Sequence, residues 1–378
     1  MNTCPYQQKC GGCSLRHLSI KEYQAYKAYK FTALVKQLQR SKDSTTDFIF
    51  IDDGMRRRCE LDFKLIKGKL FLGFNATQSH ELVDIHTCPS LTLLINQNLP
   101  HIRNFLAELC QIKISTKKKN KLITENIIGG SIHITNADNG LDVLIKTNTP
   151  FNLEHRILTC DFVNSQPDIV RISMQMQNKI PEIIVEKVAP IINMNNAAVN
   201  IPPGAFLQAS FDGQKALADT VKEYIGNVNG NIADLFCGIG TFSYYLSDNI
   251  KNKITAVDSA FELISEFQKN INRLVLPNIK IVQRNLFKYP LDTQELSNFD
   301  IIIFDPPRAG AKAQITKICE LNSADKPQKI IAISCNPHTF VNDAVMLAEN
   351  GYNLNAITMI DQFVYNKHFE LVALFERI

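Results

Sequence analysis

Three residues in the last quarter of the sequence carry side chains that could modify a pyrimidine ring. Cys335 follows the apolar run "KIIAIS", Asp305 follows "IIIF", and Glu370 begins "ELVALF". A thiolate can add to C6 of a uracil or cytosine ring, which makes C5 a carbon nucleophile able to attack a sulfonium methyl group. A base must then remove the C5 proton, and Glu370, with His368 nearby, is the candidate for that step.

Each of these residues also has a simpler structural interpretation. An isolated cysteine is commonly a small buried residue, but the polar neighbours of Cys335 in "ISCNP" and its place at a strand end favour contact with a ligand. Asp305 opens "DPPRAG", which could be merely a rigid loop. Because the two prolines fix the backbone behind Asp305, its carboxylate could instead face a polar edge of a base.

A glycine loop further upstream has the composition of a nucleoside-binding turn. The segment "DLFCGIG" at 234–240 follows an apolar run, so Gly238 and Gly240 let the backbone approach a ligand closely. Asp258, in "AVDS", follows about one strand later and can bond a ribose hydroxyl pair. The loop lacks the third glycine of a dinucleotide site, so S-adenosylmethionine fits better than a dinucleotide; a plain structural turn is the alternative.

The elements that must position these residues alternate between helix and strand. From residue 211 onward, helical periodicity alternates with short apolar strands, which predicts a parallel, doubly wound α/β sheet with ligands at the carboxyl ends of its strands. Residues 50–200 instead show short alternating runs separated by Gly, Asn and Pro, which predicts a mainly β domain. We expect two domains, 1–203 and 204–378.

Charge is distributed unevenly along the chain. Residues 1–205 contain 25 Lys and Arg against 18 Asp and Glu, whereas residues 206–378 contain 16 against 19. A positive first half suits a polyanionic partner, although a solvated basic surface is the commoner explanation. No apolar run has the length of a membrane span or the form of a signal peptide, so we expect a cytoplasmic protein with no membrane partner.

The cysteines at the N-terminus form the densest cluster of possible metal ligands. The chain has ten cysteines, and in a reducing compartment these are more often metal ligands, nucleophiles or core residues than disulfides. Cys4, Cys10 and Cys13 leave a fourth ligand to be found. A zinc site would usually supply a second close pair downstream, and the sequence has no such pair.

Taken together, these motifs resemble the bacterial RNA 5-methyluridine methyltransferases that use S-adenosylmethionine. The shared segments occur in the family's order along nearly the whole chain: "FLQAS", "DLFCGIGTF", "FDPPRAG", "SCNP" and "HFELV". The resemblance implies a Rossmann-like class I methyltransferase domain, with Cys335 as the nucleophile and Glu370 as the proton acceptor. The positions that it assigns to the cofactor and uridine site are Gln208, Phe236, Asp258, Asn285 and Asp305.

The chain departs from the family pattern at three of these motif positions. Thr241 and Ser210 stand where many members carry Asn, which puts two individual hydrogen bonds in doubt. Asp258 replaces a usual Glu, and this change keeps an acceptor for the ribose.

The same resemblance completes the cysteine cluster. Iron-sulfur members of the family share the cysteine triplet with its "CGGC", and their fourth cysteine matches Cys88. The implied cofactor is a [4Fe-4S] cluster held by Cys4, Cys10, Cys13 and Cys88, which would clamp the N-terminus to the β domain. A structural zinc is the alternative.

The expected substrate is a structured RNA. Many members carry a small β-barrel RNA-binding domain upstream of the cysteines, whereas this chain starts at the cysteines. We therefore expect the central domain to bind RNA phosphates. The candidates are the segment Arg56, Arg57 and Arg58, and with less weight the run Lys117, Lys118, Lys119 and Lys121.

The function that we expect is methylation of uracil C5 by a monomer, on a uridine in a loop or flipped out of its stack. A hairpin loop of 23S ribosomal RNA is favoured over transfer RNA, because the family resemblance associates the cluster with ribosomal targets. Two other functions stay open. An exocyclic amino-group methyltransferase would usually have an aromatic residue where Arg308 stands, and a non-catalytic RNA-binding or folding factor would not need Cys335 and Glu370.

Overall fold

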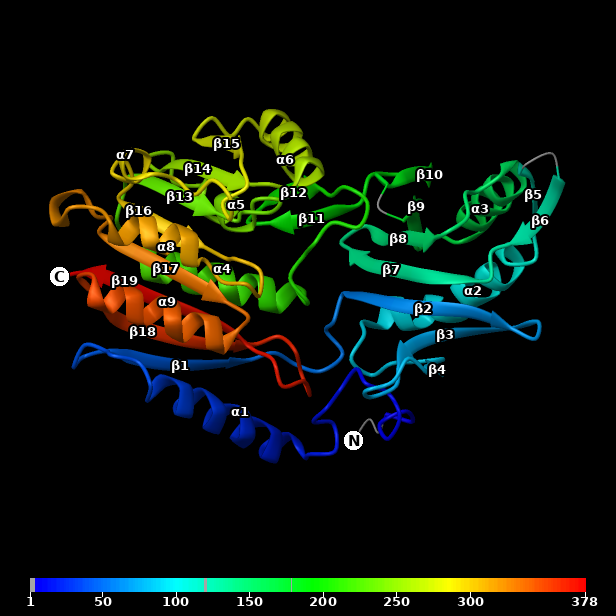
Figure 1. Ribbon diagram of the computed structural model, residues 1–378, viewed down its shortest axis with the longest axis horizontal. Coiled ribbons are helices and arrows are strands. Elements are labelled where there is room, and N and C mark those ends of the chain that lie inside the picture. The colour runs from blue at the N-terminus through cyan, green and yellow to red at the C-terminus, as the bar shows by residue number, and fades with distance from the viewer. Residues whose placement is uncertain (1–3, 119–120, 178) are drawn as a thin grey trace. The chain divides into compact units, whose positions relative to one another are not determined.

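The computed structural model describes residues 4–118, 121–177 and 179–378, which form two compact units (Figure 1). The N-terminal unit contains the residues up to His17 together with Asp53–Ile192 and Asn200–Ser210. The C-terminal unit contains Leu18–Asp52, Asn193–Val199 and Phe211–Ile378.

This division differs from a single boundary after residue 203, because Leu18–Asp52 belongs to the C-terminal unit. That segment forms helix α1 (Ile20–Val35) and strand β1 (Thr45–Phe50). Strand β1 pairs in parallel with β18 (Tyr352–Asp361), about 300 residues later in the chain. The hydrogen bonds of this ladder and the apolar face of α1 attach the segment to the C-terminal sheet.

The C-terminal unit is built on an eight-stranded sheet with the order β1-β18-β19-β17-β16-β13-β14-β15. Its remaining strands are β13 (Asn231–Leu235), β14 (Lys253–Asp258), β15 (Ile279–Gln283), β16 (Ile301–Phe304), β17 (Lys329–Ser334) and β19 (Glu370–Arg377). Strand β19 runs antiparallel to both of its neighbours, and the other printed pairings are parallel. This is the predicted Rossmann-like, doubly wound α/β arrangement.

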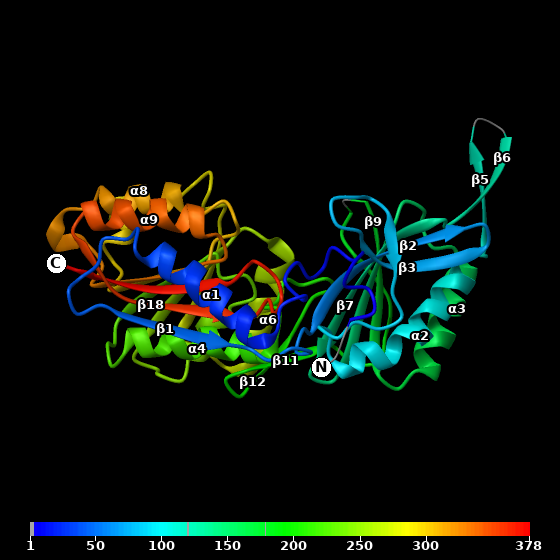
Figure 2. The ribbon, with the colours of Figure 1, turned by 90° about the horizontal axis from the view of Figure 1, so that it is seen from below.

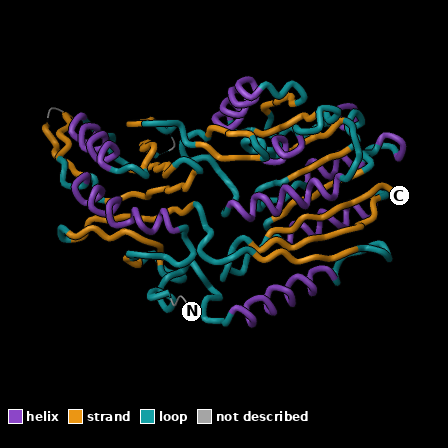
Figure 3. Tube along the Cα trace, turned by 180° about the vertical axis from the view of Figure 1, so that it is seen from behind, coloured by secondary structure: helices purple, strands orange, loops and turns teal. Residues whose placement is uncertain are grey.

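Helices cover both faces of this sheet, which explains why the strands read as continuous apolar runs. Figure 2 shows α1, α8 (Lys312–Cys319) and α9 (Pro337–Glu349) on one face and α4 (Phe211–Ile225) on the other. Phe31 of α1 shares one buried core with residues of α8 and α9. The alternation of helix and strand along this unit also includes α5 (Thr241–Leu246), α6 (Phe261–Leu274), α7 (Thr293–Leu296) and the short 3-10 helix η1 (Ser323–Asp325) (Figure 3).

The N-terminal unit is mainly β, as the alternating runs predicted. Its seven-stranded sheet has the order β10-β9-β8-β7-β2-β3-β4, in which β8 and β9 are parallel and the other pairs antiparallel. The strands are β2 (Arg58–Ile66), β3 (Lys69–Asn75), β4 (Leu82–Asp84), β7 (Gly129–Ala137), β8 (Gly140–Thr147), β9 (Ile169–Met176) and β10 (Glu182–Glu186). Strand β5 (Lys113–Lys118) pairs antiparallel with β6 (Lys121–Asn126) in the same unit. Strands β11 (Ile191–Met194) and β12 (Ala197–Asn200) form a separate two-stranded sheet, and most of its residues, Asn193–Val199, belong to the C-terminal unit.

Two helices, α2 (Leu93–Leu109) and α3 (Leu153–Ser165), pack with this sheet around one apolar core. The rings of Phe105 and Phe162 stack between the two helices, with centroids 4.3 Å apart. Across the described part of the chain, no helix combines the length and the apolar character needed to cross a membrane.

Candidate active site

The strand order brings the predicted catalytic residues to one edge of the C-terminal sheet. Asp305 directly follows β16 and Cys335 directly follows β17, two parallel neighbours whose carboxyl ends share that edge. Strand β19 runs the opposite way, so its first residue, Glu370, lies at the same edge. Two apolar strands and one reversed strand thus gather a thiol and two carboxylates.

The register of the antiparallel pair places the thiol opposite the glutamate. Ser334, the last residue of β17, pairs with Leu371 of β19. Continuing this register by one residue puts Cys335 opposite Glu370. Glu370 is 5% exposed and Cys335 is half-buried, so both side chains belong to a partly water-excluded site.

Burial and neighbouring charges raise the pKa values of both Cys335 and Glu370. Burial raises the pKa of the Cys335 thiol to about 11, and the carboxylates of Glu370 and Asp305 add to the rise. Burial likewise raises the pKa of Glu370 to about 8, again helped by Asp305. The guanidinium of Arg308 opposes both shifts. Asp305 therefore raises the pKa of both groups, and Glu370 also raises that of Cys335, a clustering of perturbed groups that is typical of a reactive site.

Short polar contacts hold the backbone around Cys335. The Asn336 side chain caps α9 by accepting a hydrogen bond from the His338 amide at 3.1 Å. Its Nδ2 donates to the Arg308 carbonyl at 2.9 Å, which connects the "SCNP" segment to the "DPPRAG" turn. The Arg308 guanidinium in turn lies 3.3 Å from Nε2 of His368, two residues before Glu370.

The glycine loop after β13 has the geometry expected of a nucleoside site. The Gly238 amide donates to Oδ2 of Asp258 at 3.0 Å, and the Ala260 amide donates to Oδ1 at 2.8 Å. Each carboxylate oxygen has a further lone pair, so Asp258 can still accept from a ribose hydroxyl. A Cβ on Gly238 would meet no atom within 4 Å, whereas a Cβ on Gly240 would overlap Phe267.

An aromatic pair borders this loop, and the sequence interpretation identified one of its members. Phe236 has a left-handed backbone (φ 61°), and its ring centroid lies 5.3 Å from that of Phe287. Phe287 is 47% exposed and follows Asn285 by two residues. Asn285 uses its Oδ1 to accept from the Phe287 and Lys288 amides, so it shapes this turn. An exposed aromatic beside a strand end was the available signal for Phe287.

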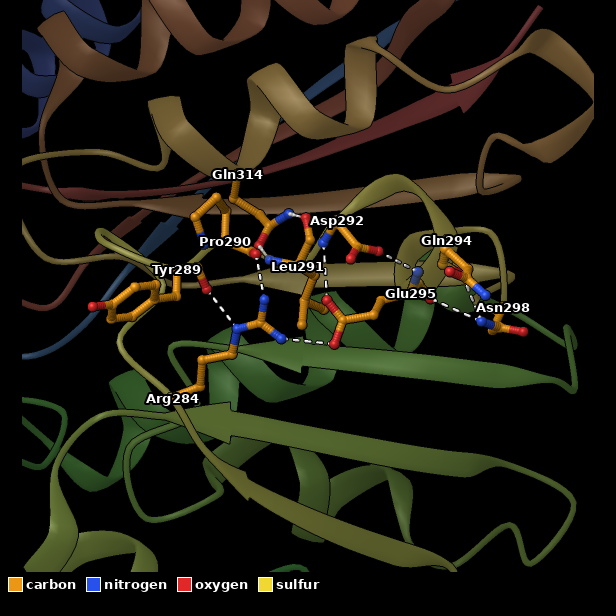
Figure 4. A network of polar contacts seen from close by, with 9 residues as sticks. All are labelled: Arg284, Tyr289, Pro290, Leu291, Asp292, Gln294, Glu295, Asn298 and Gln314. Atoms are coloured by element: carbon orange, nitrogen blue, oxygen red, sulfur yellow. Dashed lines mark hydrogen bonds and ion pairs between the residues drawn. The ribbon is translucent and has the colours of Figure 1, made fainter.

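A polar network fixes the segment that follows β15, as Figure 4 shows. Arg284 donates to the main-chain carbonyls of Tyr289 and Pro290 and forms a 2.7 Å ion pair with Glu295. Gln314 binds both the amide and the carbonyl of Leu291. The turn that carries Asn285 and Phe287 is therefore held at its far end by a guanidinium and an amide side chain.

At the other end of the loop, Thr241 begins α5 directly after Gly240, whose φ is 92°. Asp234 accepts hydrogen bonds from the Ser243 amide and hydroxyl, which joins β13 to this short helix. Burial raises the pKa of Asp234 to about 7. Asp234 thus supports the glycine loop from beneath.

In the N-terminal unit, the four predicted cluster cysteines lie in one neighbourhood. The thiols of Cys4 and Cys13 act electrostatically on those of both Cys10 and Cys88. The pKa of Cys10 is raised by burial first and by these thiols second, and burial raises the pKa of Cys88 to about 11. The Gly12 amide donates to Sγ of Cys10 at 3.4 Å.

Hydrogen bonds hold the cysteine loop and the Cys88 turn in place. The Gly11 amide donates to the Asn75 carbonyl at 3.0 Å, and the Cys88 amide donates to Asn96 at 2.8 Å. Among the residues described, no group of three or more His, Cys, Asp or Glu side chains has an arrangement that could hold a metal ion. The donor set nonetheless fits an iron-sulfur cluster in chemistry, because it offers four thiols and an amide directed at sulfur.

The predicted RNA-contacting arginines differ in what they contact. Arg57 is fully buried, and its Nε donates to the Gln208 carbonyl at 3.0 Å. It therefore holds the main chain of the "FLQAS" segment and is not exposed to phosphates, contrary to the prediction. Arg58 stacks on the exposed ring of Phe206 at 4.6 Å and binds the Leu207 carbonyl.

The remaining predicted positions are placed as follows. Arg56 is half-buried and donates to the Arg58 carbonyl at 3.1 Å. Ser210 is buried, beside Gln208 in the N-terminal unit. Lys117 and Lys118 end β5 and Lys121 begins β6, while Lys119 lies outside the described residues.

Comparison with known proteins identifies the family of the chain. Residues 191–378 match the family described as tRNA (Uracil-5-)-methyltransferase. An uncharacterized RNA methyltransferase of Agrobacterium fabrum is 32% identical over 372 residues, covering 97% of this chain and 82% of that protein. The 23S rRNA (uracil(1939)-C(5))-methyltransferase RlmD of Aliivibrio salmonicida is 28% identical over 380 residues, covering 99% of this chain and 82% of that protein.

A solved structure shares the fold along almost the whole chain. It is the Pyrococcus abyssi tRNA (uracil-54, C5)-methyltransferase in complex with S-adenosyl-L-homocysteine, with a TM-score of 0.73 and 21% identity. The similarity covers 99% of this chain and 87% of that one. These sequence matches show that this chain belongs to the family of S-adenosylmethionine-dependent RNA (uracil-C5)-methyltransferases.

Proposed function

We propose that this enzyme methylates C5 of a uridine in 23S ribosomal RNA through a covalent bond between Cys335 and C6 of the base. The observation that carries the mechanism is the register that sets Cys335 opposite Glu370, with Asp305 acting on both. The ribosomal substrate is supported by the RlmD relatives, whose sequences align with 99% of this chain.

The proposed reaction balances as follows. The half-buried Cys335 thiol gives its proton to solvent, and its sulfur forms a bond to C6 while the C5=C6 electron pair moves to C5. Bound S-adenosylmethionine would supply the methyl group from a sulfonium that C5 can attack, and S-adenosylhomocysteine would be the leaving group. Glu370 then accepts the C5 proton, the C–H electrons restore the C5=C6 bond, and the C6–S bond breaks to return the thiolate.

The protonation of the free site has a consequence for this sequence of steps. With pKa values raised to about 11 and about 8, Cys335 and Glu370 are both largely protonated at neutral pH. Glu370 must release its proton before it can act as the base. Arg308, which lowers the pKa of both groups, is the nearby residue that favours these ionised forms.

For the cofactor, Gly238, Asp258 and the pair Phe236–Phe287 are the proposed contacts in the C-terminal unit. The space beside Gly238 is open to a ligand, and Asp258 retains acceptor capacity for a ribose. Asn285, Gly240 and Thr241 shape the surrounding turns. Gln208 and Asp305 stay assigned to the site through the motifs that carry them.

For the N-terminal unit, we propose a [4Fe-4S] cluster held by Cys4, Cys10, Cys13 and Cys88. The electrostatic action of Cys4 and Cys13 on both Cys10 and Cys88 supports it, and its role would be to fasten the N-terminal loop to the unit. Arg56 is the proposed phosphate contact of its segment. We place the reaction in the cytoplasm, where bacterial ribosomal RNA is modified.

Transfer RNA is the second candidate substrate. The matched family is described by a tRNA reaction, and the Pyrococcus abyssi enzyme of similar fold acts on tRNA. Mapping 5-methyluridine by mass spectrometry in both RNAs, from a strain lacking the gene and from the complemented strain, separates the two. Loss from 23S RNA alone supports the proposal, and loss from tRNA alone contradicts the substrate assignment.

The mechanism is tested with two substitutions. Cys335→Ala should abolish methyl transfer, with a loss of at least about 1,000-fold, while leaving S-adenosylmethionine binding near normal. Glu370→Gln should accumulate a covalent protein–RNA adduct, because addition and methylation proceed while proton removal fails. Both are read by denaturing gels and by methyl incorporation into RNA. An active alanine variant would refute the mechanism.

A further inference from the structure

A fully buried lysine on α1 lies beside the segment that leads to Glu370. Lys27 has no exposed surface, and its ammonium donates to Oδ1 of Asp361 at 2.8 Å and to the His368 carbonyl. Burying an ion pair is costly unless the geometry satisfies both charges, and an apolar pair of similar size is often at least as stable. A role beyond stability is therefore worth seeking for this pair.

The two partners of Lys27 bracket one loop. Asp361 is the last residue of β18, and His368 stands two residues before Glu370, the first residue of β19. One ammonium thus joins the start of the loop 362–369 to its end. In the register of the two strands, Ile360 pairs with Glu370, so the loop closes directly beside the proposed base.

Tyr23, one helical turn before Lys27, holds the same loop. Its hydroxyl donates to the other carboxylate oxygen of Asp361, and its ring lies 4.9 Å from that of Tyr365 within the loop. Tyr365 has a left-handed backbone with φ 59°, a conformation that needs support from its surroundings. Residues four apart on a helix share one face, so α1 presents both side chains together.

The loop also contacts the proposed base directly. Gln362, the residue after Asp361, donates from Nε2 to Oε1 of Glu370 at 3.4 Å. A displacement of Asp361 would therefore move a hydrogen-bond partner of the carboxyl group, and a displacement of His368 would move its main chain. Both displacements are opposed by Lys27.

We propose that Lys27, together with Tyr23, is a positioning residue for Glu370 and sets the rate at which the C5 proton is removed. The inference rests on the proposed function of Glu370. Lys27 contacts neither base nor cofactor in this scheme. It acts by fixing the loop 362–369, so that the carboxylate lies where the C5–H bond must break and the C6–S bond can then open.

A positioning role and a purely structural role predict different kinetics. If Lys27 and Tyr23 only stabilise the fold, their loss should slow methyl transfer and proton release equally. If they position Glu370, addition and methyl transfer should be less affected than elimination, and the covalent adduct should accumulate. Small displacements of a catalytic group commonly cost on the order of 10- to 100-fold in rate.

The experiment compares two tyrosine variants of the full chain. Tyr23→Phe removes the hydroxyl that binds Asp361. Tyr224→Phe is the matched control, because Tyr224 of α4 is also buried and its hydroxyl lies 2.7 Å from Thr358, three residues before Asp361 on β18. Lys27→Met and the double variant Lys27→Met/Asp361→Asn complete the set. The double variant leaves no lone buried carboxylate, so the test survives if Lys27→Met does not fold.

The readout is a single turnover with RNA tritiated at uracil C5, in which tritium release and methyl incorporation are measured on the same sample. We expect release to lag incorporation by about tenfold in the Tyr23 and Lys27 variants, and to keep pace with it in Tyr224→Phe. Release in step with incorporation in the Tyr23 and Lys27 variants would overturn the inference.

Glu370→Gln distinguishes failure of the inference from failure of the proposed function. If Glu370→Gln shows the lag and the α1 variants do not, Lys27 has no positioning role and the assignment of the base stands. If Glu370→Gln itself shows no lag, the assignment of the base is wrong, and the inference falls with it.

Discussion

At the scale of single residues, the site gathers acidic groups whose proximity and burial favour their protonated forms. Glu370, Asp305 and Cys335 lie within electrostatic reach of one another, and Arg308 is the cation that acts on both Cys335 and Glu370. Burial weakens the solvation of the Cys335 thiolate and the Glu370 carboxylate, so the pKa values of these two groups rise. In the free enzyme Cys335 and Glu370 are therefore largely protonated at neutral pH, and both must lose a proton before they act in the proposed reaction.

The stored proton on Glu370 has a measurable effect on stability. Its pKa rises from an ordinary 4.5 to about 8 in the folded protein, so between these values the folded state binds more protons than the unfolded state. The contribution of Glu370 to the free energy of unfolding is then fully present below about pH 4.5 and is lost as the pH rises through about 8. The carboxyl group favours folding when protonated and opposes it when ionised.

We predict that Glu370→Gln is more stable than the parent enzyme at alkaline pH. Between pH 5 and pH 9 the parent should lose about 2–5 kcal/mol of unfolding free energy that the Gln variant keeps. Urea denaturation at both pH values measures the difference. Glu262→Gln, on an exposed position of α6, serves as the control and should follow the parent. Parallel pH dependence of parent and Glu370→Gln would contradict the raised proton affinity.

The strand-end residues show what the sequence could predict at this scale. Asp305 and Cys335 follow apolar runs, so their place at a sheet edge could be inferred from the pattern alone. Their relation to Glu370 could not, because it depends on the antiparallel register of β17 and β19. Arg57 was misassigned for a similar reason, since a run of three arginines does not reveal which one is buried.

At the scale of elements, the glycine loop between β13 and α5 shows two different uses of glycine. Gly240 has φ 92°, and a Cβ there would lie 2.1 Å from the ring of Phe267. Gly238 has φ 56°, and a Cβ there would meet no atom within 4 Å. The first glycine is required by packing, and the second leaves open space on the side proposed for the cofactor.

We therefore predict opposite outcomes for two alanine substitutions in one loop. Gly240→Ala should cost about 2–4 kcal/mol of stability, because it adds strain and overpacks the Phe267 contact. Gly238→Ala should cost about 1–2 kcal/mol of backbone strain while weakening S-adenosylmethionine binding roughly tenfold or more. Thermal unfolding and calorimetric titration measure the two effects. Unchanged binding in a folded Gly238→Ala variant would show that the cofactor does not occupy this space.

Helix α1 marks the limit of sequence-based prediction for elements. The sequence has helical periodicity over residues 20–40, and the structure has a helix at Ile20–Val35. Its partners were not predictable, because Lys27 and Tyr23 contact residues more than 330 positions later. Local periodicity predicts that a helix forms, whereas the residues that the helix contacts depend on tertiary packing.

At the scale of the whole molecule, the proposed catalytic residues and the proposed cluster ligands belong to different units. The proposed cofactor contacts Gly238 and Asp258 belong to the C-terminal unit together with the proposed nucleophile and base. The cysteines proposed to bind the cluster belong to the N-terminal unit, which contains 19 Lys and Arg against 14 Asp and Glu. A positive surface suits a polyanionic substrate, so RNA affinity is expected to depend on this unit.

This division predicts that loss of the cluster should leave cofactor binding intact. Anaerobically purified parent enzyme should be brown and contain about four iron atoms and four sulfides per chain. Cys88→Ser should lose most of this iron and bind RNA more weakly, because the loop around Cys10 and Cys13 is no longer held through Cys88.

The matched control is Cys160→Ser, at a half-buried cysteine of α3 in the same unit, and this variant should retain the iron. S-adenosylmethionine should bind equally to all three proteins, since its proposed contacts at Gly238 and Asp258 are in the other unit. Colourless parent enzyme with one equivalent of zinc would refute the cluster, and a Cys88→Ser variant with full iron would remove Cys88 from its ligands.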